Sequence, residues 1–258
     1  IDKTEKFITI ATTRPETMLG DTAIAVNPKD TRYKNLVGNF AIIPTVGRKI
    51  KIIEDDYADP EQGTGAVKIT PAHDFNDYEV GKRNKLEIIN IFTEDGKINN
   101  NAPEKFVGLD RFQSRKKILE ELIQKELLAK EENIKNKVPY GDRSNSIIEP
   151  FLKEQWFVDA KKLSFKAKKI VKSKKIKFFP NNWSKTYFQW MNNIEPWCIS
   201  RQLWWGHQIP AWYGPDKKIF VATNELEAKK NSKKTYKKNV KLIRDPDVLD
   251  TWFSSGLW

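Results

Sequence analysis

The sequence predicts an α+β protein. A β-barrel-like domain with surrounding helices is expected in residues 1–150, followed by a Trp- and Lys-rich extension in residues 151–258. Three observations lead to this prediction. Before residue 150, short β-rich runs alternate with turn residues, which favours a small barrel. One segment in the same part has the spacing of an amphipathic helix. All nine tryptophans lie at or after Trp156, so the composition changes near residue 150.

Five short apolar runs are predicted as strands, because each is rich in β-branched or aromatic residues and is bounded by turn residues. They comprise residues 7–11, 40–44, 49–53, 66–70 and 88–92. Pro71 ends the fourth run, and a Glu-Asp-Gly turn follows the fifth. Short strands joined by turns favour closure into a small barrel with a few helices.

A surface helix is predicted to pack on this barrel. The apolar residues that share one face are Ile118, Leu119, Leu122, Ile123 and Leu127. Asp110 and Gln113 have the spacing of a capping box at its start. The opposite face is Lys and Glu, and nothing in the helix indicates chemistry.

The formal net charge of +12 indicates an acidic partner, of which nucleic acid is the commonest; a generally lysine-rich composition is the alternative. Two lysine-rich stretches, residues 161–177 and 229–241, are expected to be solvated helix faces or loops, with contact to a nucleic-acid backbone as the alternative. No run of 18 apolar residues is present, so no transmembrane helix and no membrane partner are predicted.

The chain starts without signal-peptide anatomy and without an initiator Met, so we expect a fragment of a longer protein. The single cysteine, Cys198, excludes an intrachain disulfide and fits a reducing cytoplasm. With His73 and His207 it makes only three widely spaced zinc-type ligands, so no structural zinc is predicted.

Residues 12–17 gather three threonines, Arg14 and Glu16 at the end of the first predicted strand. Thr13 and Glu16 have the spacing of a capping box. The N-terminus of such a helix also presents free N–H groups to an anion or a carbonyl. The segment is therefore both a predicted helix start and a candidate binding site.

Residues 63–77 form the second candidate segment. Lys68 and Thr70 are two apart on a predicted strand, so their side chains point to one face. Asp74 and Asp77 are three apart and would share a face of a helical turn. A cation and a hydroxyl opposite two carboxylates could hold a ligand with a free amine. A surface Lys–Asp pair and an N-cap at Asp74 would explain the same residues without a ligand.

Both segments resemble the editing domain that is inserted in the class I synthetases for valine, isoleucine and leucine. The match is to the valyl form in residues 12–17 with 20–23, 68–74, 197–213 and 245–258. The leucyl form usually lacks Lys68, and the isoleucyl form differs in both segments.

The resemblance implies post-transfer editing, in which threonine is hydrolysed off mischarged tRNA(Val). The implied partners are the acceptor end of that tRNA and its L-threonine ester. Asp77 would bind the α-ammonium, and Asp74 or Lys68 would pair with the threonine hydroxyl. The resemblance also implies that Thr12, Thr13 and Thr17 hold water near the ester and that Arg14 supports the terminal phosphate or the ester end. Thr70 would form the floor of the pocket. His73 would act as a general base or would orient Asp74. Because the ester is already reactive, hydrolysis by a positioned water would need no covalent nucleophile from the protein.

Two departures from the valyl pattern stand out. Gln62, one wall of the implied pocket, replaces an apolar or aromatic residue, and Asp142 before Arg143 replaces a histidine or cysteine. The His-Ile-Gly-His and Lys-Met-Ser-Lys-Ser signatures are absent. We therefore expect no cofactor in this chain. ATP would be used by the Rossmann catalytic domain of the full-length chain, and residues 151–258 would lead back to that domain. A leucyl- or isoleucyl-type editing domain and a non-catalytic tRNA-docking module are the alternatives.

Overall fold

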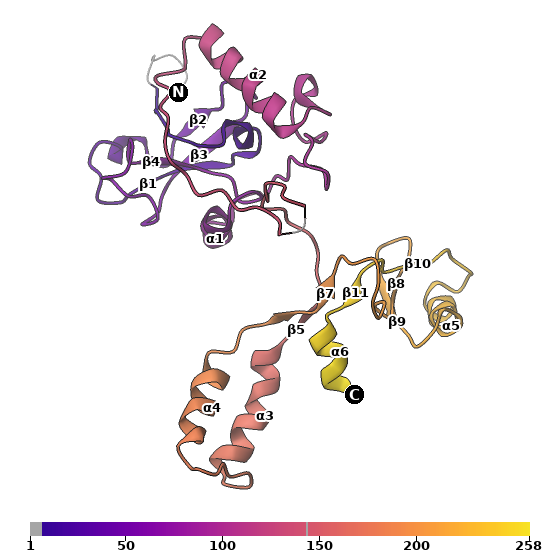
Figure 1. Cartoon of the computed structure of the whole chain (residues 1–258). Helices are drawn as coiled ribbons and strands as arrows, with labels where there is room; N and C mark the ends of the chain where they lie inside the picture. The colour runs from indigo at the N-terminus through magenta and orange to yellow at the C-terminus, as the bar shows by residue number, and fades with distance from the viewer. Residues whose placement is uncertain (1–6, 143) are drawn as a thin grey trace. The chain divides into compact units, whose positions relative to one another are not determined.

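The computed structural model describes residues 7–142 and 144–258. Residues 1–6 and Arg143 lie outside the described residues. The expectation that the chain starts without signal-peptide anatomy concerns residues 1–6. The chain divides into two compact units, Ile1–Lys153 and Glu154–Trp258 (Figure 1). The division lies a few residues after the predicted composition change near residue 150.

The first unit is built on a mixed sheet with the strand order β2-β3-β1-β4 (Figure 1). Its strands are β1 (Ala23–Val26), β2 (Phe40–Ile42), β3 (Lys49–Glu54) and β4 (Ala66–Ile69). β1 pairs in parallel with β3 and antiparallel with β4, and β2 pairs antiparallel with β3. β1 was not predicted, because it is buried at every residue and so lacks the alternation of a half-exposed strand.

The mixed α+β class is confirmed, but the predicted barrel is not. The sheet is open, with β2 and β4 at its edges. Three predicted strands correspond to β2, β3 and β4, whereas residues 7–11 and 88–92 form none. The second of these runs has only an isolated bridge between Phe92 and Ile98. With two of the five expected strands missing, no strand in the described part of the chain joins the two edges of this sheet.

Helix α2 (Arg111–Gln124) starts as predicted, with a capping box between Asp110 and Gln113. Ile118 and Leu122 are buried in the core. Ile123, predicted on the same face, is 58% exposed. It lies about 100° round the helix from Leu122 and so points away from the core.

Helix α1 (Phe75–Arg83) packs against the end of β4. The close approach depends on Gly81, because a Cβ there would lie 2.7 Å from Cγ of Pro71. Val80 of the helix and Ile69 of the strand are fully buried in one apolar cluster. The first turn of α1, which holds Asp77, is thereby held beside the residue that follows β4. The short 3-10 helices of this unit are η1 (Pro15–Gly20), η2 (Lys34–Leu36) and η3 (Glu104–Phe106).

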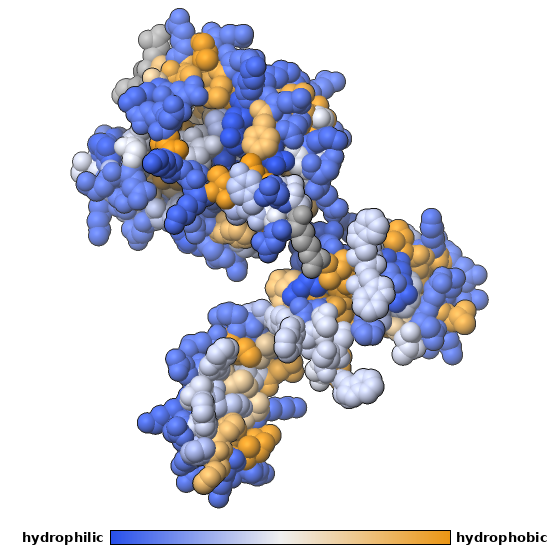
Figure 2. All heavy atoms as spheres, in the orientation of Figure 1, coloured by the Kyte–Doolittle hydropathy of each residue, from blue (hydrophilic) through white to orange (hydrophobic). Residues whose placement is uncertain are grey.

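The second unit is made of small pieces. Its helices are α3 (Ala160–Lys172), α4 (Trp183–Asn192), α5 (Glu225–Tyr236) and α6 (Thr251–Leu257). Its ladders pair β5 (Phe157–Val158) with β6 (Trp197–Cys198), β7 (Ser200–Arg201) with β11 (Val248–Leu249), and β8 (Ala211–Tyr213) with β9 (Ile219–Val221) and β10 (Ile243–Arg244). α3 and α4 lie side by side and carry apolar patches among hydrophilic ones (Figure 2).

The lysine-rich stretches fall mainly on α3 and α5, and most of their lysines are exposed, as predicted. Many tryptophans are exposed too, including Trp190, Trp204, Trp205 and Trp258. Within the part of the chain that the structure describes, none of the helices has the length and apolar character needed to cross a membrane.

Candidate active site

Lys68 is the centre of a buried polar cluster in the first unit. Its Nζ donates hydrogen bonds to Oγ1 of Thr70 at 2.6 Å, Oγ1 of Thr17 at 2.8 Å and Oδ1 of Asp21 at 3.2 Å. All four residues are buried. An ammonium group has three N–H donors, so this set of partners uses every one of them. The prediction that Lys68 and Thr70 share a face is confirmed.

Asp21 is a member of this cluster that the sequence analysis missed. Its carboxylate accepts a hydrogen bond from Oγ1 of Thr70 at 2.5 Å and forms the ion pair with Lys68. Burial raises the pKa of the Asp21 carboxyl, while the charge of Lys68 opposes the rise. The residue reaches the cluster because β1 runs antiparallel to β4, with Ala23 opposite Ile69. A lysine on a buried strand requires an anion, and that requirement is the signal that could have led to Asp21.

Asp77 and Asp74 lie at the start of α1. Asp74 caps the helix and accepts hydrogen bonds from the backbone N–H groups of Asn76 at 2.8 Å and Asp77 at 3.1 Å. Oδ2 of Asp77 accepts the N–H of Thr70 at 2.8 Å. Burial raises the pKa of the Asp77 carboxyl from 3.8 to about 6, although the Thr70 hydrogen bond and the charge of Lys68 act the other way. Among residues 7–142 and 144–258, none forms an ion pair with Asp77.

Tyr57, from the loop between β3 and β4, is a further neighbour that the sequence did not indicate. Burial raises the pKa of its phenol, and the negative charges of Asp77 and Asp74 raise it further. A side-chain hydrogen bond with Asn76, in the first turn of α1, opposes this rise.

His73 has a structural position. It is fully buried, and its ring packs against Phe92 with centroids 4.6 Å apart. Nε2 accepts the N–H of Ile91 at 3.0 Å, so the proton is on Nδ1, which faces the carbonyl oxygen of Pro150 at 3.3 Å. Burial lowers the pKa of His73 to about 4. Because both nitrogens bond elsewhere, the prediction that His73 orients Asp74 is wrong, and neither nitrogen is left to act as a general base.

The predicted capping box at residues 13–16 is also wrong. The helix there is η1, which begins at Pro15 with Arg14 as its N-cap and without a side-chain cap. Glu16 is fully buried and instead accepts two hydrogen bonds of 2.7 Å from the guanidinium of Arg115 on α2. The requirement to neutralise a buried carboxylate outweighs a local cap.

Three of the predicted site residues, called the rim, are exposed: Gln62, Thr12 and Thr13. The turn after Gln62 lies against the N-terminal segment, since a Cβ on Gly63 would sit 3.6 Å from Cβ of Ala11. Among the described residues, no hydrogen bond joins Gln62 to the Lys68 cluster, which lies at the other end of β4. The predicted site residues therefore include an exposed group, the rim, and a buried group around Lys68, the floor.

Arg14 connects the rim to deeper residues. Its guanidinium donates to the carbonyl oxygen of His73 at 2.8 Å through Nη1 and to Glu149 through Nη2. Glu149 lies just before the end of the first unit and was not found by the sequence analysis.

The family model described as tRNA synthetases class I (I, L, M and V) matches residues 4–258. The chain belongs to this family of class I tRNA synthetases. The predicted family resemblance is thus confirmed.

The relatives of this class I synthetase chain include valine--tRNA ligases. It is 80% identical over 258 residues to the one from Pelagibacter ubique and 56% identical over 256 residues to the one from Caulobacter vibrioides. These two matches cover 100% and 99% of this chain but only 30% and 28% of the length of the two relatives. Among solved structures, the ternary complex of Agrobacterium radiobacter K84 agnB2 LeuRS with tRNA and LeuAMS is similar over 98% of this chain and 29% of the LeuRS chain. The TM-score is 0.37 and the sequence identity is 15%, so the similarity is distant.

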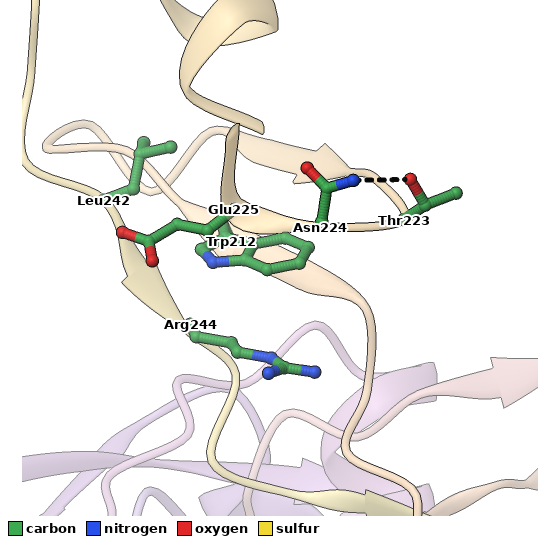
Figure 3. Close-up of a pocket in the computed structure, with 6 residues that line it drawn as sticks. All are labelled: Trp212, Thr223, Asn224, Glu225, Leu242 and Arg244. Atoms are coloured by element: carbon green, nitrogen blue, oxygen red, sulfur yellow. Dashed lines mark hydrogen bonds between the residues drawn. The ribbon is translucent and has the colours of Figure 1, made fainter. Parts of the chain in front are cut away.

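Two cavities lined by described residues lie in the second unit of this class I synthetase chain, and neither includes a predicted site residue. One, of about 360 Å³, is lined by Trp212, Thr223, Asn224, Glu225, Leu242 and Arg244 (Figure 3). The other, of about 390 Å³, lies among α3, α4 and α6. In the described part of the chain, no group of three or more His, Cys, Asp or Glu residues is placed to bind a metal ion. A metal-free site stays a prediction.

Proposed function

We propose that the first unit is the editing site of a valyl-tRNA synthetase and hydrolyses threonyl-tRNA(Val). The relatives are valine--tRNA ligases along the whole chain, and within the unit one observation supports the proposal most. Asp77 is a buried carboxylate without an ion-pair partner among the described residues, and its neighbour Lys68 is already paired with Asp21. The α-ammonium of an aminoacyl ester is the cation that such a carboxylate lacks.

The chemistry of valine explains why such a site is needed. Threonine and valine have the same shape, and valyl enzymes are the standard example of an apolar site that cannot strongly reject an added hydroxyl. An editing site must do the reverse. It must hold polar groups that a threonine hydroxyl satisfies and that valine leaves unpaired. The Thr, Lys and Asp residues of this site meet that requirement.

The hydroxyl is assigned to Asp74 rather than to Lys68. All three donors of Lys68 are used by Thr17, Thr70 and Asp21, so accepting a substrate would mean breaking one of these bonds. Asp74 uses Oδ1 for the two N–H groups of α1, which leaves Oδ2 to accept the substrate hydroxyl. Lys68 then acts indirectly, by holding Thr70, whose N–H in turn fixes Asp77.

The reaction requires only a positioned water. Water attacks the ester carbonyl carbon, the bond from that carbon to the ribose oxygen breaks, and the products are threonine and tRNA with a free hydroxyl. The ester is already activated, so holding the water and the carbonyl in place supplies most of the catalysis. Thr12 and Thr13 are assigned to the water, and Arg14 to the anionic end of the tRNA. Thr17 and Thr70 support them from the floor.

The direct test is a deacylation assay with the full-length protein. We expect threonyl-tRNA(Val) to be cleared well above the background rate and valyl-tRNA(Val) to be spared, since valine leaves Oδ2 of Asp74 unpaired. Hydrolysis of leucyl- or isoleucyl-tRNA in preference would indicate the leucyl or isoleucyl type instead. Binding of tRNA that weakens steeply with salt, without any turnover, would replace the proposal with a docking module.

Deacylation should depend on pH through Asp77. The carboxyl must be ionised to bind the ammonium, and its pKa is about 6 in the free protein. We expect kcat/KM, corrected for spontaneous hydrolysis, to fall as the pH drops through about 6 and to level off above 7, because kcat/KM reports the free enzyme. A profile that is flat between pH 5 and 7.5 would contradict this role. The comparison reaction is the spontaneous hydrolysis of the same ester at each pH.

A further inference from the structure

Glu149 holds two arginines that come from different parts of the first unit. One carboxylate oxygen, Oε2, accepts a hydrogen bond from Nη2 of Arg14, and Oε1 forms an ion pair with Nε of Arg111 at 3.1 Å. The Glu149 side chain is 14% exposed, and those of Arg14 and Arg111 are 25% and 14% exposed. A charge pair at this depth is screened less by solvent than a surface pair.

Pro150, the residue after Glu149, contacts the same region through His73. The carbonyl oxygen of Pro150 faces Nδ1 of His73, and the carbonyl oxygen of His73 accepts Nη1 of Arg14. Residues 149 and 150 therefore close a ring of contacts with Arg14 and His73. Arg14 is fixed from both ends of its guanidinium, so the direction of its side chain is set by these two contacts.

We infer that Glu149 is a positioning residue for Arg14 in editing. The inference rests on the proposed function, in which Arg14 faces the anionic end of the tRNA. Glu149 touches no reacting atom. It selects one rotamer of a long side chain that would otherwise lose its orientation, and so removes an entropic cost at binding. Its effect should appear in KM rather than in the chemical step.

The neighbouring carboxylate of Glu16 does not hold the Arg14 side chain in the same way. Glu16 spends both oxygens on Arg115, at 2.7 Å each, and is 3.9 Å from Nε of Arg14. If Glu149 loses its charge, the carboxylate left to Arg14 among the described residues is Glu16 at 3.9 Å, and the His73 carbonyl oxygen is its remaining close hydrogen-bond partner.

The test compares Glu149→Gln with wild type in the full-length protein. Glutamine keeps the size of the side chain and removes the charge. We expect KM for threonyl-tRNA(Val) to rise roughly tenfold or more with kcat little changed. In an Arg14→Ala background the same substitution should add nothing, because its effect passes through Arg14. Additive effects, or a fall in kcat at constant KM, would overturn the inference.

Glu121→Gln is the matched control. Glu121 is also a carboxylate between two cations, Lys105 and Lys125, but it lies near the end of α2 and contacts no site residue. We expect its KM and kcat to match wild type. A KM rise equal to that of Glu149→Gln would mean that general loss of ion pairs, and not the position of Arg14, is responsible.

A second readout does not require editing. Phenylglyoxal modifies free guanidinium groups, and peptide mass spectrometry reports each arginine separately. Arg14 should be modified several-fold faster in Glu149→Gln than in wild type, with Arg201 in the second unit as the internal reference. An unchanged rate at Arg14 overturns the positioning role. Faster modification in a protein whose wild type deacylates nothing would uphold the contact and reject the proposed function.

Discussion

Asp77→Asn should abolish deacylation of threonyl-tRNA(Val) and at the same time stabilise the folded protein at pH 8. The amide keeps the size of the side chain and can still accept the N–H of Thr70. It carries no charge, so the substrate ammonium loses its partner. We expect kcat/KM to fall at least about a hundredfold, as for removal of a charged partner from a buried contact.

The gain in stability follows from the raised pKa. Burial raises the Asp77 pKa from 3.8 to about 6, so the folded state binds this proton more tightly than the unfolded state does. The ionised carboxylate therefore costs stability above pH 6, on the order of 1–3 kcal/mol. Below pH 3.8 that cost is absent. Calorimetry should show a higher Tm for the variant at pH 8 and a difference that shrinks as the pH falls through 6. Equal Tm values at pH 8 would contradict the assignment, and an active Asp77→Asn would contradict the proposed role.

Lys68→Met is expected to produce the largest loss of stability. It removes the cation from the buried pair with Asp21 and leaves that buried carboxylate without its ion-pair partner. Breaking a buried pair from one side costs about 3–5 kcal/mol. Chemical denaturation of the protein measures the effect. Lys82→Met, on the exposed face of α1, is the control and should stay within about 0.5 kcal/mol of wild type.

The double variant Lys68→Met with Asp21→Asn separates charge from packing. It removes both charges, so most of the lost stability should return. A double variant as unstable as the single one would show that Lys68 contributes through packing alone, and that the ion pair with Asp21 is not the reason for the loss.

Much of the floor could be predicted from local spacing. The two-residue period of a strand placed Lys68 and Thr70 on one face, and their hydrogen bond confirms it. The cap at Asp74 and the capping box of α2 also follow from local pattern, because each involves residues that are close in sequence. Predictions of this kind need no knowledge of which strands pair.

The rest depends on contacts between distant residues. Asp21 reaches Lys68 through the antiparallel pairing of β1 with β4, and β1 is too short and too evenly buried to be recognised alone. Glu16 was expected to cap a helix but pairs with Arg115, 99 positions along the chain. His73 and Gln62 were assigned to the pocket from their places in a motif. Tertiary packing instead buries the first and leaves the second on the rim.

The saturated ammonium of Lys68 has a consequence for anyone who would redesign the site. A group whose three donors are all satisfied by Thr17, Thr70 and Asp21 cannot be altered without disturbing the other three. Mutant libraries aimed at a different amino acid should therefore leave these four positions alone. Thr12, Thr13 and Gln62 are exposed and bear no such mutual dependence. Substitutions at these three positions would carry little risk to folding, but those at Thr12 and Thr13 would alter the proposed water site.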